Sequence, residues 1–218
     1  MDTTNSMNST ASANSPDSTA STASTASTPL KLAVVVASNR EGRFGPVIAD
    51  WFLGRTAERD DFTVDVVDLA EIDLPTSLSY RPSAAVRAEL AKVTPVLAAA
   101  DAFVVLTPEY NHSFPAALKS LIDWHYTEWQ AKPVGFVSYG GMSGGLRAVE
   151  QLRQVYAEMH AVTVRDTVSF HNAHGHFDEN GRHKDPTGPD AAAKTMLDQI
   201  AWWARTLRDA KSTRPYAA

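Results

Sequence analysis

The sequence predicts an α/β fold in which helices cover both faces of an open, doubly wound parallel sheet. Short runs rich in Val, Leu and Phe alternate with helical patterns along the chain, and the first, third and fourth runs are apolar almost throughout. Strands that are apolar on both sides are typical of parallel sheets buried between two layers of helices. Strands that are each followed by a helix need right-handed crossovers, which gives a three-layer domain.

The order of the elements favours a five-stranded sheet. The first strand is expected where LKLAVVVAS is apolar until its small and polar end, and strands two and five alternate more strongly, as edge strands do. Five strands with five helices match the flavodoxin-like order 2-1-3-4-5 better than the six-stranded dinucleotide-binding order. The expected elements are, in order, strand 30–38, helix 45–59, strand 62–67, helix 83–100, strand 102–106, helix 116–124, strand 133–137, helix 147–159, strand 162–168 and helix 189–210.

Residues 1–28 differ from the rest of the chain in composition. They are rich in Ser, Thr and Ala and contain no basic residue, so we expect a disordered tail that buries no core. The segment has neither the basic start and apolar run of a secretory signal nor the arginines of a transit peptide. We therefore expect one domain over 29–211, followed by a short C-terminal tail over 212–218.

Charge and composition exclude several classes of function. The 218 residues include 20 Lys plus Arg and 25 Asp plus Glu, and a net charge of −5 argues against nucleic-acid binding. The absence of cysteine excludes disulfides and thiolate metal sites and is compatible with a cytoplasmic protein. No apolar run approaches the roughly 20 residues of a membrane span.

The loop after the first predicted strand reads SNREGRFGP over residues 38–46 and leads into a helix, with Pro46 suited to its first turn. Ligands of doubly wound sheets lie at the carboxyl ends of the strands, so this loop is a candidate site. A helix N-terminus offers unpaired N–H groups to an anion, and Ser38, Arg40 and Arg43 add a hydroxyl and two guanidinium groups. These features predict phosphate binding, although they also fit an ordinary polar turn, and neither GxGxxG nor GxxxxGK is present.

The loop after the third predicted strand, TPEYNHSFP at 107–115, is stiffened by two prolines. Tyr110 can pack on a flat ring and Asn111 can bind its polar edge, which favours a heteroaromatic ligand. The alternative is a turn that caps the next helix, with Ser113 as its N-cap, and both interpretations can hold together.

The loop after the fourth predicted strand, SYGGMSGG at 138–145, contains four glycines. Glycine lets the backbone approach a ligand closely and leaves its N–H groups unshielded. A glycine-rich loop is weak evidence by itself. Its expected position, at the same edge of the sheet as the other two loops, strengthens the prediction of a ligand site.

Together, the three loops resemble those of the NAD(P)H-dependent FMN reductase family, with similarity over about residues 31–207. The family pattern is Gly-Ser-x-Arg in the first loop, Thr-Pro-Glu-Tyr-Asn-x-Ser-x-Pro-x-x-Leu-Lys in the second and Gly-Gly-x-x-Gly-Gly in the third, and the second is nearly unbroken here. The resemblance implies that Ser38 and Arg40 hold the FMN phosphate, that 108–111 line the isoalloxazine and that 140–145 cover its pyrimidine side. The full set implied for cofactor binding is Ser38, Arg40, Arg43, Phe44, Gly45, Pro108, Glu109, Tyr110, Asn111, Ser138, Tyr139, Gly140, Gly141, Gly144 and Gly145.

The first loop departs from the family pattern. Ala37 stands where the family often has Gly, and Gly45 stands where it often has Ser. One phosphate-binding hydroxyl is therefore expected to be missing, and Arg43 is a candidate to compensate for it. Weaker binding of this kind would favour a protein that releases its flavin.

By this resemblance, the chain is an FMN-dependent oxidoreductase that passes hydride from NADPH or NADH to flavin. Electrons then pass to a small-molecule acceptor such as free flavin, a quinone or an azo compound, and no side chain is expected to be catalytic in the narrow sense. The resemblance also implies a homodimer or homotetramer with its active site near the interface. His125, Tyr126 and Trp129 would then border the flavin of a partner subunit.

Two other functions stay open. A flavodoxin-type carrier would hold FMN and transfer electrons without oxidising NAD(P)H, but such carriers usually have a Thr- or Ser-rich phosphate loop and strong acidity. A flavin-free domain that keeps the fold for binding or regulation is the other alternative. Arg40, Asn111 and the four glycines argue against it.

Histidines and tryptophans offer two further candidate features. The segment HNAHGHFDENGRH at 171–183 combines four histidines with carboxylates, a combination that can bind zinc or iron. It resembles the Phe-Asp-Glu-x-Gly turn of the same family, so we expect solvated loop histidines and no metal. Core or interface positions, rather than a substrate pocket, are expected for Trp124, Trp129, Trp202 and Trp203.

Overall fold

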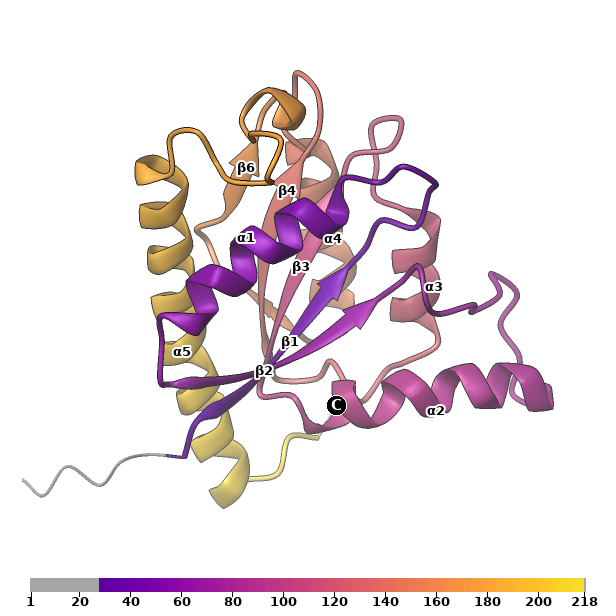
Figure 1. Cartoon of the computed structure of the whole chain (residues 1–218). Helices are drawn as coiled ribbons and strands as arrows, with labels where there is room; N and C mark the ends of the chain where they lie inside the picture. Colours follow the sequence, from indigo (N-terminus) through magenta and orange to yellow (C-terminus); the bar gives the residue numbers. More distant parts are fainter. Residues whose placement is uncertain (1–27, 218) are drawn as a thin grey trace, which may run out of the picture.

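The computed structural model describes residues 28–217, so the predicted tail 1–28 lies outside the described residues except for Thr28. Strands and helices alternate along the described chain (Figure 1). The strands are β1 (Leu30–Val36), β2 (Phe62–Asp68), β3 (Ala102–Pro108), β4 (Pro133–Tyr139), β5 (Val162–Thr163) and β6 (Val168–Phe170). The helices are α1 (Gly45–Ala57), α2 (Ala84–Ala99), α3 (Ala116–Asp123), α4 (Leu146–Glu158), the short 3-10 helix η1 (Ala173–Gly175) and α5 (Thr187–Thr213).

The strands form one parallel sheet in the order β2-β1-β3-β4-β5, and β6 also pairs with β4. This confirms the predicted flavodoxin-like order. The prediction of a continuous fifth strand over 162–168 is wrong, because pairing with β4 is interrupted between β5 and β6. At the interruption, the carbonyl oxygens of Val164 and Arg165 accept hydrogen bonds of 2.8 and 3.0 Å from the Arg153 guanidinium on α4.

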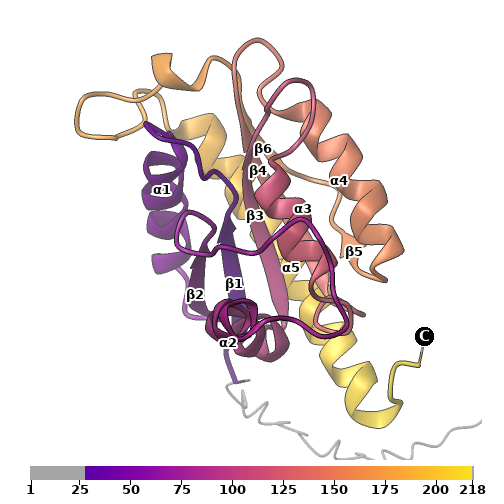
Figure 2. The same ribbon diagram turned by 90° about the vertical axis from the view of Figure 1, so that its right-hand side faces the viewer.

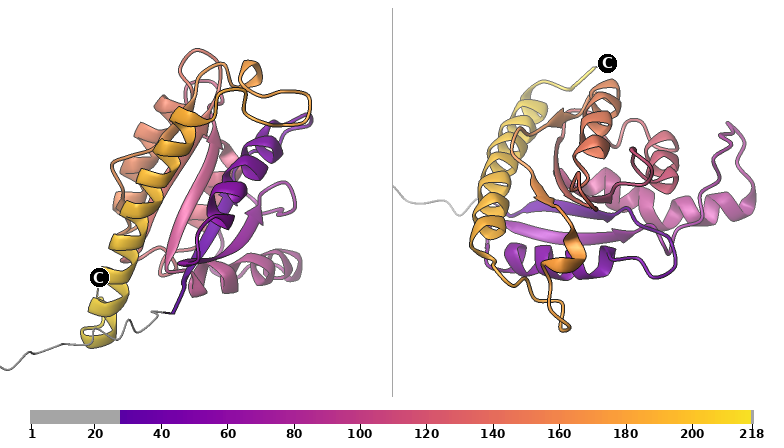
Figure 3. Two further views of the ribbon diagram at one scale, coloured as in Figure 1. Left: turned by 60° about the vertical axis from the view of Figure 1, so that its left-hand side comes forward. Right: turned by 90° about the horizontal axis from the view of Figure 1, so that it is seen from above.

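Two hydrophobic cores lie on opposite faces of the sheet. Helices α1 and α5 pack on one face, and α2, α3 and α4 pack on the other (Figures 2 and 3). Along the central strands β1, β3 and β4 every residue except Lys31 is buried, as their apolar runs predict. No helix in residues 28–217 combines the length and the apolar character needed to cross a membrane.

The carboxyl ends of β1, β3, β4 and β6 meet at one edge of the sheet, which is the upper edge in Figure 1. Parallel pairing places the ends of β3 and β4 side by side, with Pro108 opposite Tyr139, and the end of β6 beside the end of β4, with Phe170 opposite Tyr139. The loops that follow these strands are therefore neighbours in space.

Candidate active site

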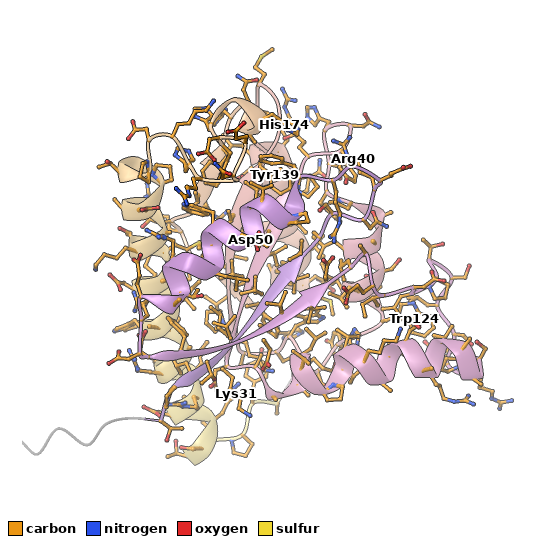
Figure 4. The ribbon with its side chains drawn as sticks, in the orientation of Figure 1. Lys31, Arg40, Asp50, Trp124, Tyr139 and His174 are labelled. Carbon is orange, nitrogen blue, oxygen red and sulfur yellow. The ribbon has the colours of Figure 1, made fainter. Side chains whose placement is uncertain are left out.

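A cleft of about 390 Å³ opens at this edge of the sheet. Figure 4 shows Arg40, Tyr139 and His174 gathered there, with Lys31 at the opposite edge. The loops after β1, β3, β4 and β6 all contribute to its walls. The lining residues are Arg40, Phe44, Pro108, Glu109, Tyr110, Tyr139, Gly140, Gly141, Asn172, Ala173, His174 and Gly175.

Two buried hydroxyl groups meet where α1 begins. Ser38 is 1% exposed, and neither its Oγ nor the Tyr139 Oη has a hydrogen-bond partner among the described residues. Burial raises the pKa of Tyr139, and the neighbouring Ser38 hydroxyl offsets only part of this rise. Leaving a buried hydroxyl unpaired costs roughly 1–3 kcal/mol, so this corner fits a ligand that accepts hydrogen bonds. The N-terminus of α1 favours an anionic one.

Gly45 has a steric reason to lack a side chain. A Cβ at this position would lie 2.1 Å from Ser38 Oγ and 3.1 Å from Tyr139 Oη. The space that a serine side chain would need is therefore already occupied by the two unpaired hydroxyl groups.

The two arginines of the first loop are placed differently. Arg40 lines the cleft, and its guanidinium lies 5.4 Å from the centre of the Tyr110 ring. Arg43 instead forms a two-pronged ion pair with Asp68, with N···O distances of 2.5 and 2.6 Å, and donates to the Ser38 carbonyl at 2.9 Å. Its hydrogen bond to Asp68 raises the pKa of Arg43. Three of the five N–H donors of the Arg43 guanidinium are therefore bound to Asp68 and to the Ser38 carbonyl, and Arg43 does not line the cleft.

The loop after β3 is a tight hairpin. Tyr110 and Ser113 exchange backbone hydrogen bonds of 2.8 and 3.1 Å, and Asn111 and His112 between them have φ values of 49° and 75°. Asn tolerates this left-handed conformation better than most residues. Ser113 does not cap α3 as predicted, because its Oγ donates to Gln151 Oε1 at 2.5 Å and α3 has no side-chain cap. Tyr110 Oη is a third buried hydroxyl without a partner in the described chain.

Glu109 turns its carboxylate toward the start of α4. It accepts hydrogen bonds from Arg147 Nη1 at 2.9 Å and Arg147 N at 3.3 Å. Burial alone would raise the pKa of Glu109, but hydrogen bonds from Ser143 and Arg147 outweigh burial and lower it. The N-cap of α4 is Gly145, which has no side chain to bond the first N–H groups, so Glu109 satisfies one of them from another loop.

The four glycines of the third loop have two different roles. Gly144 and Gly145 have φ values of +60° and +84°, and a Cβ on Gly144 would lie 2.5 Å from Ser169 Oγ. Gly140 and Gly141 line the cleft, and a Cβ on Gly141 would meet nothing within 4 Å. Gly144 and Gly145 are therefore needed to fold the loop, while Gly140 and Gly141 form part of the cleft wall.

Ser138, at the start of this loop, holds its backbone in place through a hydrogen bond. Its side chain is fully buried, and Oγ donates to the Gly144 carbonyl at 2.8 Å. Of the fifteen residues predicted for cofactor binding, the structure brings eight to the cleft wall. Those that do not line it are Ser38, Arg43, Gly45, Asn111, Ser138, Gly144 and Gly145.

The segment 172–175 after β6 also lines the cleft, and the sequence did not indicate it. Its backbone is fastened to the glycine loop, with Asn172 N donating to Gly141 O at 2.8 Å and Ala173 N to Gly140 O at 3.1 Å. The His174 ring packs on Phe44, with ring centres 4.3 Å apart. A usable signal in the sequence was Asn172, two residues beyond β6, because Asn tolerates the left-handed conformation that it adopts here at φ 49°. Across residues 28–217, no three His, Cys, Asp or Glu side chains form a group that could hold a metal ion.

The expectation that His125 and Trp129 border the flavin of a partner subunit is wrong. They are 4% and 0% exposed in the core of this chain. His125 is hydrogen-bonded to Thr94 Oγ1 and Leu121 O, both at 2.8 Å. Tyr126, by contrast, is exposed.

Comparison with known proteins identifies related sequences. The sequence model of the family described as NADPH-dependent FMN reductase matches residues 30–175. An NAD(P)H-dependent FMN reductase of Schizosaccharomyces pombe is 38% identical over 133 residues, or 57% of this chain and 64% of that protein, which is less than two thirds of its length. A 2-hydroxy-1,4-benzoquinone reductase of a Burkholderia species is 29% identical over 82% of this chain and 98% of its own.

A solved structure supports the fold. FerB, a flavoenzyme NAD(P)H:(acceptor) oxidoreductase from Paracoccus denitrificans, superposes with a TM-score of 0.63 at 18% identity, covering 81% of this chain and 98% of its own. The family match spans the described chain from β1 to η1 and includes all three loops that build the cleft. The chain therefore belongs to the NADPH-dependent FMN reductase family.

Proposed function

We propose that this protein is an FMN-dependent oxidoreductase that takes electrons from NAD(P)H and delivers them to a small-molecule acceptor. The observation that carries the proposal is the set of three buried hydroxyls without partners in the described chain, on Ser38, Tyr110 and Tyr139. Tyr110 and Tyr139 line the cleft, and Ser38 lies beside Tyr139 at the start of α1. A ligand rich in oxygen acceptors satisfies these groups, and FMN combines such acceptors with a phosphate.

The residues present fit FMN at both ends. The N-terminus of α1, Arg40 and the hydroxyls of Ser38 and Tyr139 would hold the phosphate. The flat aromatic ring of Tyr110 and the open backbone at Gly141 would border the ring system. When bound, FMN supplies the two-electron redox chemistry that these side chains lack.

The protein's own contribution would be binding and positioning. The ion pair between Glu109 and Arg147 joins the loop after β3 to the start of α4, which fixes two walls of the cleft relative to each other. The bonds from Asn172 and Ala173 to the glycine loop fix a third. A preorganised cleft of this kind holds two reactants in contact without further reorganisation.

A quinone-type acceptor is the class that we favour. The wall of the cleft includes Phe44, Tyr110 and His174, whose flat rings suit a planar acceptor. The quinone reductase of Burkholderia supports the same class, since it aligns with most of this chain.

We also propose that the protein is cytoplasmic and forms a homodimer or homotetramer. The cysteine-free sequence suits a reducing compartment. Leu78 and Tyr80, in the loop before α2, are exposed apolar groups that a second copy would cover. Light scattering on the eluting protein tests the assembly: a mass of one chain, 23.6 kDa, would exclude it.

Absorbance spectroscopy tests the activity. The purified protein is titrated with FMN and then mixed with NADH or NADPH without oxygen, and we expect bound flavin to bleach rapidly and to recover its colour on adding a quinone. Flavin that binds but is not reduced by either nucleotide would indicate an electron carrier. No flavin binding at micromolar FMN would refute the proposal.

A further inference from the structure

A bidentate ion pair fastens the first loop to the neighbouring strand. Asp68 is the last residue of β2, and both of its carboxylate oxygens bind the Arg43 guanidinium, at 2.5 and 2.6 Å. The carboxylate is itself held by Ala70 N at 3.0 Å. Arg43 and Asp68 are about four-fifths buried, with side chains 19% and 21% exposed, so solvent screens this pair less than a surface ion pair.

The Arg43 guanidinium also forms a hydrogen bond within the first loop. Arg43 Nη1 donates to the carbonyl oxygen of Ser38 at 2.9 Å, so one side chain joins the start of the loop to its end. The segment between them includes Arg40, which lines the cleft, and Gly42, whose φ is +63°. Without such a link, a polar loop that contains a glycine in this conformation has many alternative conformations to choose from.

We propose that Arg43 and Asp68 are positioning residues that preorganise the first loop for the phosphate of the flavin, without contacting the flavin themselves. This inference rests on the proposed function, since it concerns the affinity of the same site. Fixing a loop in its bound conformation before the ligand arrives removes an ordering cost from binding. We therefore expect the effect to be largest for ligands that carry the phosphate.

The competing role, in which Arg43 binds the phosphate directly, makes the opposite prediction for Asp68. If Asp68 only competed with a phosphate for Arg43, removing its charge would free the guanidinium and tighten FMN binding. If the pair preorganises the loop, removing the charge weakens FMN binding, even though the protein loses a negative charge that repels phosphate.

The test compares the dissociation constants of FMN and of riboflavin, which has the same ring but no phosphate, by flavin fluorescence titration of the full chain. In Asp68→Asn we expect the FMN constant to rise about tenfold and the riboflavin constant to stay within about twofold. The matched control is Asp65→Asn, an exposed residue on the same strand with the same change of charge, which should bind both flavins as the parent does. Arg43→Lys is the second variant: it keeps the charge, but a single nitrogen cannot span Ser38 O and both oxygens of Asp68.

Each outcome decides the matter. Selective loss of FMN affinity in Asp68→Asn supports the inference, and the same loss is expected in Arg43→Lys. If Asp68→Asn does not fold, Asp68→Glu takes its place: it keeps the charge but moves the carboxylate from its bidentate position, and selective loss of FMN affinity there supports the inference. Unchanged or tighter FMN binding in Asp68→Asn overturns the inference. An equal loss of affinity for FMN and riboflavin also overturns it, because this would indicate a general structural role. A parent protein that binds neither flavin overturns the proposed function as well, whereas a parent that prefers FMN leaves that function intact whatever the variants do.

Discussion

Replacing Tyr139 by Phe is expected to change two properties in opposite directions: the flavin-free protein becomes more stable, and FMN binds more weakly. The Tyr139 hydroxyl is buried at the end of β4 and has no hydrogen-bond partner in residues 28–217. It lies beside Ser38 Oγ at the start of α1, where we propose that the phosphate binds. In the flavin-free protein the unpaired hydroxyl therefore lowers the stability of the fold, whereas in the complex it donates a hydrogen bond to the phosphate.

The size of both effects follows from this geometry. An unpaired buried hydroxyl costs roughly 1–3 kcal/mol, so its removal should raise the free energy of unfolding by about 1 kcal/mol after the lost contacts of one oxygen are subtracted. In a domain of this size that corresponds to about 2–4 °C in Tm. A hydrogen bond to a charged group contributes about 1.5–3 kcal/mol, so the dissociation constant of FMN should rise about ten- to a hundredfold.

Tyr156 provides the matched control. It is fully buried and its Oη also has no partner within the described chain, but it packs against Trp129 in the core on the face of α2, α3 and α4. Tyr156→Phe should therefore give a similar gain in stability and no change in FMN affinity. The measurements are urea unfolding of flavin-free protein and fluorescence titration with FMN. Loss of stability in Tyr139→Phe, or unchanged FMN affinity, would refute the reasoning.

Three further predictions concern single residues of the site. Arg40→Ala should weaken FMN binding by about 1.5–3 kcal/mol and leave riboflavin binding unchanged, as fluorescence titration would show. Gly144→Ala should lower the free energy of unfolding by about 1–3 kcal/mol because of its φ of +60° and the contact with Ser169, while Gly141→Ala should be nearly neutral in the same urea experiment. Because the pKa of Glu109 is lowered on folding, its stabilising effect is complete above the pKa of an unfolded Glu, about 4.3, and is lost as pH falls through the folded value. The Tm difference between parent and Glu109→Gln should therefore shrink below about pH 4.3, and a constant difference in Tm would contradict the ion pair.

The order of the elements could be predicted because it depends on patterns that are local in sequence. Central strands show as apolar runs, and Pro46 and Ser83 mark the starts of α1 and α2. The break in the fifth strand could not be predicted, since the Arg153 side chain that binds the backbone carbonyls there belongs to a different element. Local patterns carry no information about such contacts.

The same limit applies inside the site. The motifs identify which loops form the cleft, because glycines and prolines restrict the backbone locally. They do not say which way a polar side chain turns: Arg40 and Arg43 are alike in sequence, yet one lines the cleft and the other binds Asp68 on a strand 25 residues away. Glu109 likewise bonds to Arg147 at the start of α4, which only the fold brings near.

The structure also changes the expectation about flavin release. The sequence suggested weak FMN binding, because Gly45 replaces a serine and one hydroxyl is missing. A Cβ at Gly45 would lie 2.1 Å from Ser38 Oγ and 3.1 Å from Tyr139 Oη, so a tyrosine from β4 adds a second hydroxyl beside the place that the serine would take. The number of donors at the start of α1 is thus maintained, and we expect FMN to be retained on desalting in the parent and lost in Tyr139→Phe. Equal loss of FMN from both proteins would show that the tyrosine does not replace the serine.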